Sequence, residues 1–133
     1  MSEQDIIAEW LQIAYEDYDI ASYLFVNKRP QPLEIVCYHC QQSAEKSLKG
    51  FLCARGMEVP KTHEVGMLCR RCATLDSTFT AYFKQCDTLE QYATGTRYPS
   101  RVTIDEANTK MILKQTLAIY NFVLERIPFT PNK

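Results

Sequence analysis

The chain has 133 residues, of which 46% are hydrophobic and four are glycine, a composition typical of one folded globular domain over residues 1–133. Its formal net charge of −1 excludes nucleic-acid binding that is driven by a large overall positive charge. No apolar run approaches the roughly 18 residues of a membrane-spanning helix. The opening MSEQDIIAEW lacks the basic and apolar regions of a secretory signal. We therefore expect a cytoplasmic protein whose six cysteines are reduced thiols.

Charge is distributed unevenly along the chain. Residues 1–27 contain six acids and no Lys or Arg, whereas residues 28–101 contain eleven bases and seven acids. This asymmetry predicts a local basic surface that could bind phosphate. Ordinary solvated helix faces are the alternative interpretation.

Residues 2–27 are predicted to form the first helix. Ser2 and Asp5 are a weak match to a capping box at its start. An apolar stripe then steps by four and three residues through Trp10, Ala14, Asp17, Ala21 and Leu24. The proline-rich 29–32 stretch ends this helix, since proline lacks an amide donor and restricts the residue before it.

Four further helices are expected. The second covers residues 33–55 and closes at Gly56, which can adopt the left-handed conformation. The third starts near His63 with Thr62 as its cap, and the fourth runs from Asp76 or Ser77 to about residue 93. After a Gly- and Pro-containing segment, Thr103 and Glu106 form a capping box for a last helix of roughly 36 Å, which ends at residue 127 ahead of a proline. This order predicts an all-α, up-and-down antiparallel bundle.

Two C-x-x-C pairs, Cys37/Cys40 and Cys69/Cys72, are separated by 28 residues. Four thiolates with this spacing can form a zinc site, which makes a zinc-stabilised structural module one hypothesis. Both pairs fall inside predicted helices, however, where residues three apart share a face. We therefore favour four thiols that pack in the core as small apolar side chains.

Polar residues recur along one side of the second helix. Gln41, Glu45 and Lys49 are spaced by four, and Gln42 and Lys46 occupy the neighbouring strip. Glu45 and Lys49 have the orientation of a helical ion pair, worth only about 0.2–0.5 kcal/mol if exposed. A solvated helix face is the alternative interpretation of these residues.

Asp17 lies in the middle of the apolar stripe of the first helix. A buried carboxylate is unfavourable unless it is paired, so we expect a cationic or donor partner. The candidates are Lys46, Lys49 and Arg97. The alternative is that Asp17 lies at the edge of the stripe, near water.

Arg97, Tyr98 and Pro99 precede the last helix. Arginine offers a planar fork for phosphate, and tyrosine offers a ring for stacking and a hydroxyl. This loop is therefore a candidate ligand site. The alternative is that Arg97 pairs with Asp17 or Glu45 while Tyr98 closes the end of the bundle.

Several of these patterns together resemble the HEPN family (higher eukaryotes and prokaryotes nucleotide-binding domain). They are the first-helix stripe, the Gln41-Gln42-x-Ala44-Glu45-Lys46-x2-Lys49 run, Pro60-x-Thr62-His63 and Arg97-Tyr98-Pro99, which cover nearly the whole chain. The resemblance implies a bundle of four to five helices, usually a homodimer, that is commonly paired with a minimal nucleotidyltransferase in a two-component or toxin–antitoxin-like system. We expect no cofactor. Arg97, Tyr98, Lys46, Lys49 and Gln42 would bind a nucleotide or RNA, while Asp17 and Glu45 would be structural polar residues.

Many members of that family are metal-independent ribonucleases with an Arg followed, after four to six residues, by a His. The Arg would hold the phosphate and the His would act as acid or base. Arg97 has no His at that spacing, and seven residues separate Arg55 from His63. A binding protein is therefore favoured over an enzyme. A ribonuclease with Arg97 and His63 in the catalytic roles remains the alternative, because the two could meet in space.

Overall fold

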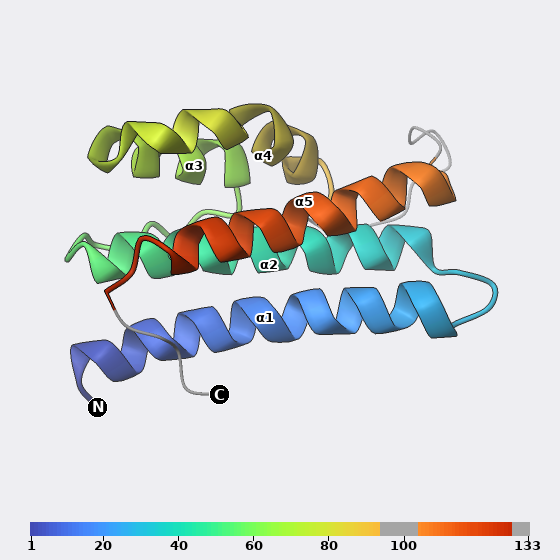
Figure 1. The fold of residues 1–133 in the computed structure, drawn as a ribbon, viewed down its shortest axis with the longest axis horizontal. Helices are drawn as coiled ribbons and strands as arrows, with labels where there is room; N and C mark the ends of the chain where they lie inside the picture. Colours follow the sequence, from blue (N-terminus) through green and yellow to red (C-terminus); the bar gives the residue numbers. More distant parts are fainter. Residues whose placement is uncertain (94–103, 129–133) are drawn as a thin grey trace.

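A computed structural model describes residues 1–93 and 104–128, which form five α-helices and one 3-10 helix, with no β-strand among them (Figure 1). The prediction of an all-α bundle is confirmed. No described helix has the length and the apolar character needed to cross a membrane. The elements are α1 (Glu3–Asn27), α2 (Leu33–Ala54), α3 (Val65–Leu75), the 3-10 helix η1 (Ser77–Tyr82), α4 (Phe83–Glu90) and α5 (Glu106–Leu124).

The first two helices have the predicted boundaries. The hydroxyl of Ser2 accepts a hydrogen bond from the amide of Asp5 at 3.2 Å, and the Asp5 carboxylate accepts one from the amide of Ser2 at 2.9 Å. This reciprocal pair satisfies two amides that the helix itself cannot bond. Gly56 has a φ of 74°, the left-handed conformation that follows the end of α2.

The start of α3 and the form of the next helix differ from the prediction. The N-cap of α3 is Glu64, because the hydroxyl of Thr62 accepts a hydrogen bond from the Glu64 amide and makes a local turn ahead of the helix. Asp76 caps the next element as expected, through the amide of Thr78. That element is η1, however, and α4 follows it only as far as Glu90.

The last helix is shorter than expected. Its cap is Asp105, whose carboxylate accepts a hydrogen bond from the Asn108 amide at 2.7 Å. The predicted cap, Thr103, lies outside the described residues. The helix ends at Leu124, so its 19 residues span about 28 Å rather than 36 Å.

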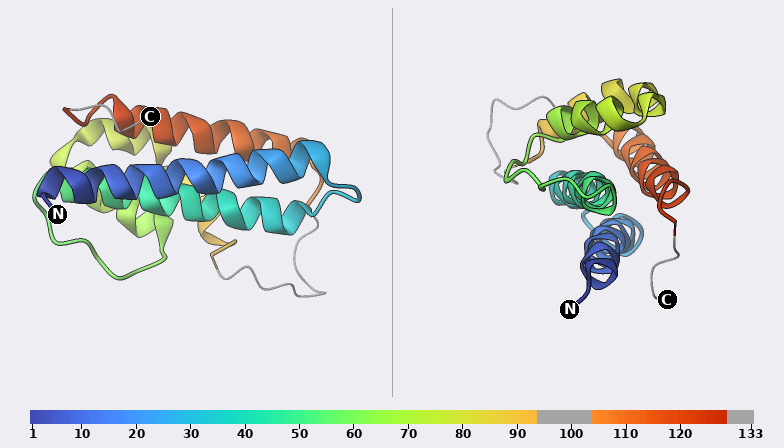
Figure 2. Two further views of the ribbon diagram at one scale, coloured as in Figure 1. Left: turned by 90° about the horizontal axis from the view of Figure 1, so that it is seen from below. Right: turned by 90° about the vertical axis from the view of Figure 1, so that its left-hand side faces the viewer.

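Helix α2 occupies the middle of the bundle. It contacts α1, α3, α4 and α5, while α1 runs antiparallel to it along one side (Figures 1 and 2). Helix α1 approaches α2 closely at Gly50, where an added Cβ would lie 3.0 Å from Leu11 Cδ2 and 3.3 Å from Trp10 Cβ. Because neighbours surround α2 on most sides, even its polar side chains lie partly inside the bundle. This placement creates the candidate site.

Candidate functional site

The polar ladder of α2 is buried rather than solvated. The exposed fraction is 0% for Gln41 and 2% for Glu45, and both face the segment that leads into α3. Buried polar groups are unfavourable unless they are hydrogen-bonded. The ladder therefore has to be satisfied from within the protein.

Glu45 is the centre of this network. Its carboxylate accepts a hydrogen bond from Lys49 Nζ at 2.9 Å and one from Gln41 Nε2 at 3.3 Å. The Nδ1 atom of His63 lies 3.1 Å from both carboxylate oxygens. A single buried acid thus binds a lysine, an amide and a histidine, which are the partners that a buried charge requires.

The environment keeps Glu45 ionised. Burial would raise the pKa of Glu45, but hydrogen bonds from Lys49 and His63, together with the charges of Lys49 and Lys46, hold that pKa below its usual value. An ionised carboxylate can only accept hydrogen bonds. The Nδ1 atom of His63, which bonds this carboxylate, must therefore carry a proton. Its Nε2 atom is then the one left for a ligand, on a side chain that is 71% exposed.

A second row of hydrogen bonds joins this centre to the surface. Lys46 Nζ donates to Gln42 Oε1 at 2.7 Å, and Gln42 Nε2 donates to Gln41 Oε1 at 2.8 Å. Gln41 Nε2 also donates to the main-chain oxygen of His63 at 2.9 Å. Within the part of the chain that the structure describes, Lys46 has no carboxylate within 4.0 Å. Two lysines therefore face one acid, and the network carries surplus positive charge.

The two lysines have different environments. Lys49 is 6% exposed, and its ammonium lies 5.8 Å from the centre of the Trp10 ring, so it is enclosed with Glu45. Lys46 is partly exposed. Lys49 stabilises the buried carboxylate, and Lys46 presents the accessible charge.

Asp17 pairs with a residue that the sequence did not indicate. Its carboxylate lies 3.0 Å from His39 Nδ1, so the predicted partners Lys46 and Lys49 are wrong; Arg97 lies outside the described residues. Both side chains are partly buried, at 16% and 24% exposure. His39 follows Asp17 by 22 residues, and only the packing of α1 on α2 brings them together. The sequence indicated only that Asp17 needs a hydrogen-bond donor, and it did not indicate that His39 is that donor.

The residues of the candidate loop, Arg97 and Tyr98, lie outside the described residues. Their proposed part in ligand binding stays a prediction. The same holds for a meeting of Arg97 with His63.

All four thiols of the C-x-x-C pairs have no exposed surface. Cys72 Sγ donates to the main-chain oxygen of Leu48, and Cys69 Sγ to that of Phe79. Burial raises the pKa of Cys40 to about 12 despite a hydrogen bond with Thr116, which keeps it a neutral thiol. Across residues 1–93 and 104–128, no three His, Cys, Asp or Glu side chains gather as metal ligands. The zinc hypothesis needs all four thiols to converge, and the described structure does not bring them together as a ligand group.

The comparisons with known proteins agree with the fold. The family model described as the HEPN domain matches residues 7–127, most of the chain. At the level of the family, this match supports a helical protein associated with nucleotides or RNA. No curated protein matches the chain, and no solved structure does.

Proposed function

Because the chain belongs to the HEPN domain family, we propose that it binds a phosphate-bearing ligand, a nucleotide or an RNA, at the network around Glu45. The observation that carries this proposal is the surplus positive charge of that network. Lys46 is partly exposed and lacks a carboxylate partner in the described part of the chain, and hydrogen bonds through Gln42 and Gln41 connect it to the segment that carries the exposed ring of His63.

Each residue of the network has a distinct role in this proposal. Lys46 attracts the phosphate as a point charge, and Gln42 orients the lysine through its side-chain oxygen. His63 donates or accepts a hydrogen bond through Nε2, while Glu45 and Lys49 hold it from inside the bundle. Arg97 and Tyr98 would add a guanidinium fork and a stacking ring.

A titration tests the site. AMP, ATP and a single-stranded RNA of about 12 nucleotides, within the usual site size of single-strand binders, are added to the protein with a chelator present, and amide chemical shifts are followed. We expect saturable shifts in α2 and residues 57–64 that Lys46→Ala weakens about tenfold, as for one charged hydrogen bond of about 1.4 kcal/mol. The control is Lys28→Ala, an exposed lysine beyond the end of α1. Equal loss in both variants would contradict a specific site.

The partners are a second copy of the chain and a minimal nucleotidyltransferase, in a toxin–antitoxin-like or other two-component system of the cytoplasm. The HEPN resemblance supports the nucleotidyltransferase. The homodimer has independent support from α1. Ile6, Ile13 and Ile20 recur every seven residues along this helix, and their exposed fractions are 38%, 38% and 44%. An exposed apolar stripe of this kind is typical of a helix that packs against another helix.

Two measurements test these partners. Light scattering at several concentrations should give a dimer mass for the wild type and a monomer mass for Ile13→Asp. Met57→Asp is the control, because Met57 is similarly exposed but lies outside α1. Co-purification from native lysate should recover a nucleotidyltransferase, and a monomeric chain that is recovered alone would contradict both partners.

A metal-independent ribonuclease is the second candidate, favoured by the pair of Glu45 and His63. The buried carboxylate holds the ring through Nδ1 and leaves Nε2 for proton transfer, the arrangement of a general acid or base. RNA should then be cut in the presence of chelator, and His63→Ala should abolish cutting while His39→Ala does not. Intact RNA across varied sequences would exclude this candidate.

A further inference from the structure

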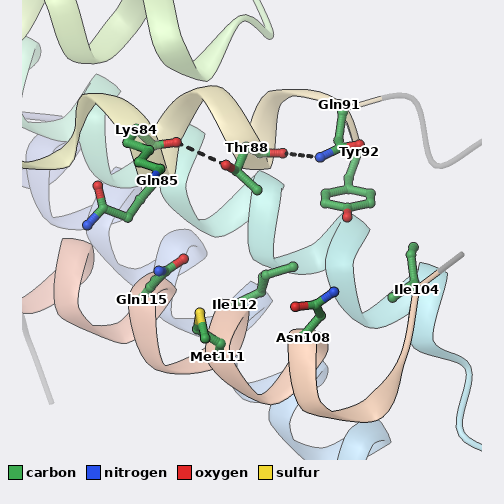
Figure 3. A pocket seen from close by; sticks show the side chains of 10 residues that line it. All are labelled: Lys84, Gln85, Thr88, Gln91, Tyr92, Ile104, Asn108, Met111, Ile112 and Gln115. Carbon is green, nitrogen blue, oxygen red and sulfur yellow. Dashed lines mark hydrogen bonds between the residues drawn. The ribbon is translucent and has the colours of Figure 1, made fainter. Parts of the chain in front are cut away.

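A groove lies between α4 and α5, on helices that contribute no residue to the Glu45 network. Its deeper part is a pocket of about 510 Å³, within the range of ligand-binding clefts. Figure 3 shows Asn108, Ile112 and Met111 of α5 lining this pocket opposite Thr88 of α4 and Gln91, which follows the end of α4.

The groove continues as a shallower hollow of about 570 Å³ along the outer side of α5. The two parts meet at Met111 and Gln115, which line both. Ala107, Met111 and Ala118 follow one another at helical spacing along this hollow, and Met111 is 56% exposed. An exposed Met between two alanines leaves an apolar strip where another helix can approach closely.

The edges of the groove are positive. Lys84 lines the deeper part, and Lys110 and Lys114 line the shallower part. Among the described residues none of these three lysines has a carboxylate within 4.0 Å, and no Asp or Glu lines either part. Their charge is therefore available to a partner.

Hydrogen-bonding capacity is also unused inside the groove. The Oε1 atom of Gln85 is buried and has no hydrogen-bond partner in the described structure. The side-chain amides of Asn108 and Gln115 likewise have no partner among the described residues. The amide of Asn108, an exposed residue, can therefore donate to or accept from a partner.

From these features we propose that the α4–α5 groove binds an acidic amphipathic helix of a partner protein. The strip from Ala107 to Ala118 covers about 16 Å of helix axis, or three turns, which suits anchors at i, i+3, i+4 and i+7. Glutamates beside those anchors would pair with the three lysines. A single-stranded nucleic acid fits less well, because Tyr92, the one aromatic ring that lines the groove among the described residues, is 7% exposed and offers little surface for stacking.

A designed peptide tests the groove. The probe is a labelled helix of about 18 residues, or five turns, with a leucine stripe flanked by glutamates, compared with the same helix carrying lysines and with a scrambled sequence. We expect saturable binding of the acidic helix alone, weakened by salt. Met111→Asp should reduce affinity at least tenfold. Lys110→Glu with Lys114→Glu should transfer the preference to the basic helix.

Controls and outcomes separate this proposal from the ligand site on α2. Lys46→Ala and Ile13→Asp should leave peptide binding unchanged. A negative result for ligand binding at the Glu45 network can therefore be told apart from a negative result for helix binding in the groove. Circular dichroism checks the fold of each variant. If Met111→Asp unfolds, the variant with Lys110→Glu and Lys114→Glu still tests the proposal. No binding of the acidic helix, or equal binding of the basic one, overturns the proposal. Binding of an RNA oligonucleotide to the groove that disappears when the same lysines are replaced would also overturn the proposal.

Discussion

The Nδ1 atom of His63 lies 3.1 Å from both oxygens of Glu45, so that a buried carboxylate holds a largely exposed imidazole. The acid lies inside α2 and the histidine lies ahead of α3, 18 residues later. This pair joins the interior of the bundle to its surface, so it bears on both the stability of the fold and the chemistry that a ligand can meet.

Glu45→Gln should destabilise the protein by about 3 kcal/mol, because the substitution leaves Lys49 buried without its counter-ion, and breaking a buried pair costs more than the pair itself contributes. The free energy of unfolding in urea measures the effect. The matched control is Glu9→Gln, on the exposed face of α1, which should change stability by less than about 0.5 kcal/mol. Glu45→Gln with Lys49→Met should restore part of the loss, and a double variant no better than the single one would contradict the pairing.

Acid should destabilise the wild type through Glu45. Its pKa is lowered in the folded state, so the stability it contributes is present above its unfolded pKa of about 4.5 and is lost as the pH falls through the lower, folded value. Urea unfolding between about pH 6 and pH 3 measures this slope. Glu45→Gln should have the shallower slope, and identical slopes would show that Glu45 does not carry the effect.

Asp17→Asn should cost about 1 kcal/mol, the usual value of one hydrogen bond. The substituted amide would keep the volume of the side chain but lose the charged acceptor for His39, which is 3.0 Å away across the α1–α2 interface. A double-mutant cycle with His39→Gln isolates the pair, and its coupling energy should exceed about 0.5 kcal/mol. Strictly additive effects would mean that the contact contributes nothing.

Five of the six thiols should resist a thiol reagent in the folded protein. Cys53 is half-buried and should react first, whereas Cys37, Cys40, Cys69, Cys72 and Cys86 have no exposed surface. Reaction needs a thiolate, and burial raises the pKa of Cys40 to about 12. Counting modified thiols against time measures this order. Cys53→Ser should remove the fast phase, and rapid loss of a second thiol would contradict the packing of the core.

His63→Asn should weaken phosphate binding more than it weakens folding. The side chain is 71% exposed, so its removal should cost less than about 1 kcal/mol of stability even though Glu45 loses one donor. Binding of AMP and thermal unfolding are measured on the same samples. Lys61→Asn, in the same segment, is the control. A large loss of stability with unchanged binding would give His63 a structural role only.

Local patterns predicted the early helices well. Ser2 and Asp5 are three residues apart, and Gly56 lies two residues beyond the end of α2, so short-range chemistry decides both boundaries. The predicted starts of the later helices were wrong where the local sequence allowed two different hydrogen-bonding patterns. Thr62 could cap a helix or make a turn, and it makes the turn, since its hydroxyl accepts the amide of Glu64 and α3 begins only at Val65. Asp105 similarly takes the cap of α5.

The sequence predicted what kind of partner a residue needs better than it predicted which residue of another helix provides it. The need of Asp17 for a donor followed from its place in an apolar stripe, but the donor is His39, which the crossing of α1 and α2 selects. The ladder of Gln41, Glu45 and Lys49 was visible as spacing, whereas its burial depends on helices that cover α2. Spacing along one helix says which residues share a face, not what covers that face.

The amino-acid sequence by itself determined that this protein is a helical bundle of the HEPN family, because helical periodicity and capping act over a few residues. Tertiary structure alone decided that Glu45 is a buried centre bound by Lys49 and His63, and that a pocket between α4 and α5 continues into a hollow along α5 that lysines line. Both features depend on how distant helices pack. Packing sets which charges lose contact with water, and a charge without water must find its partner in the protein.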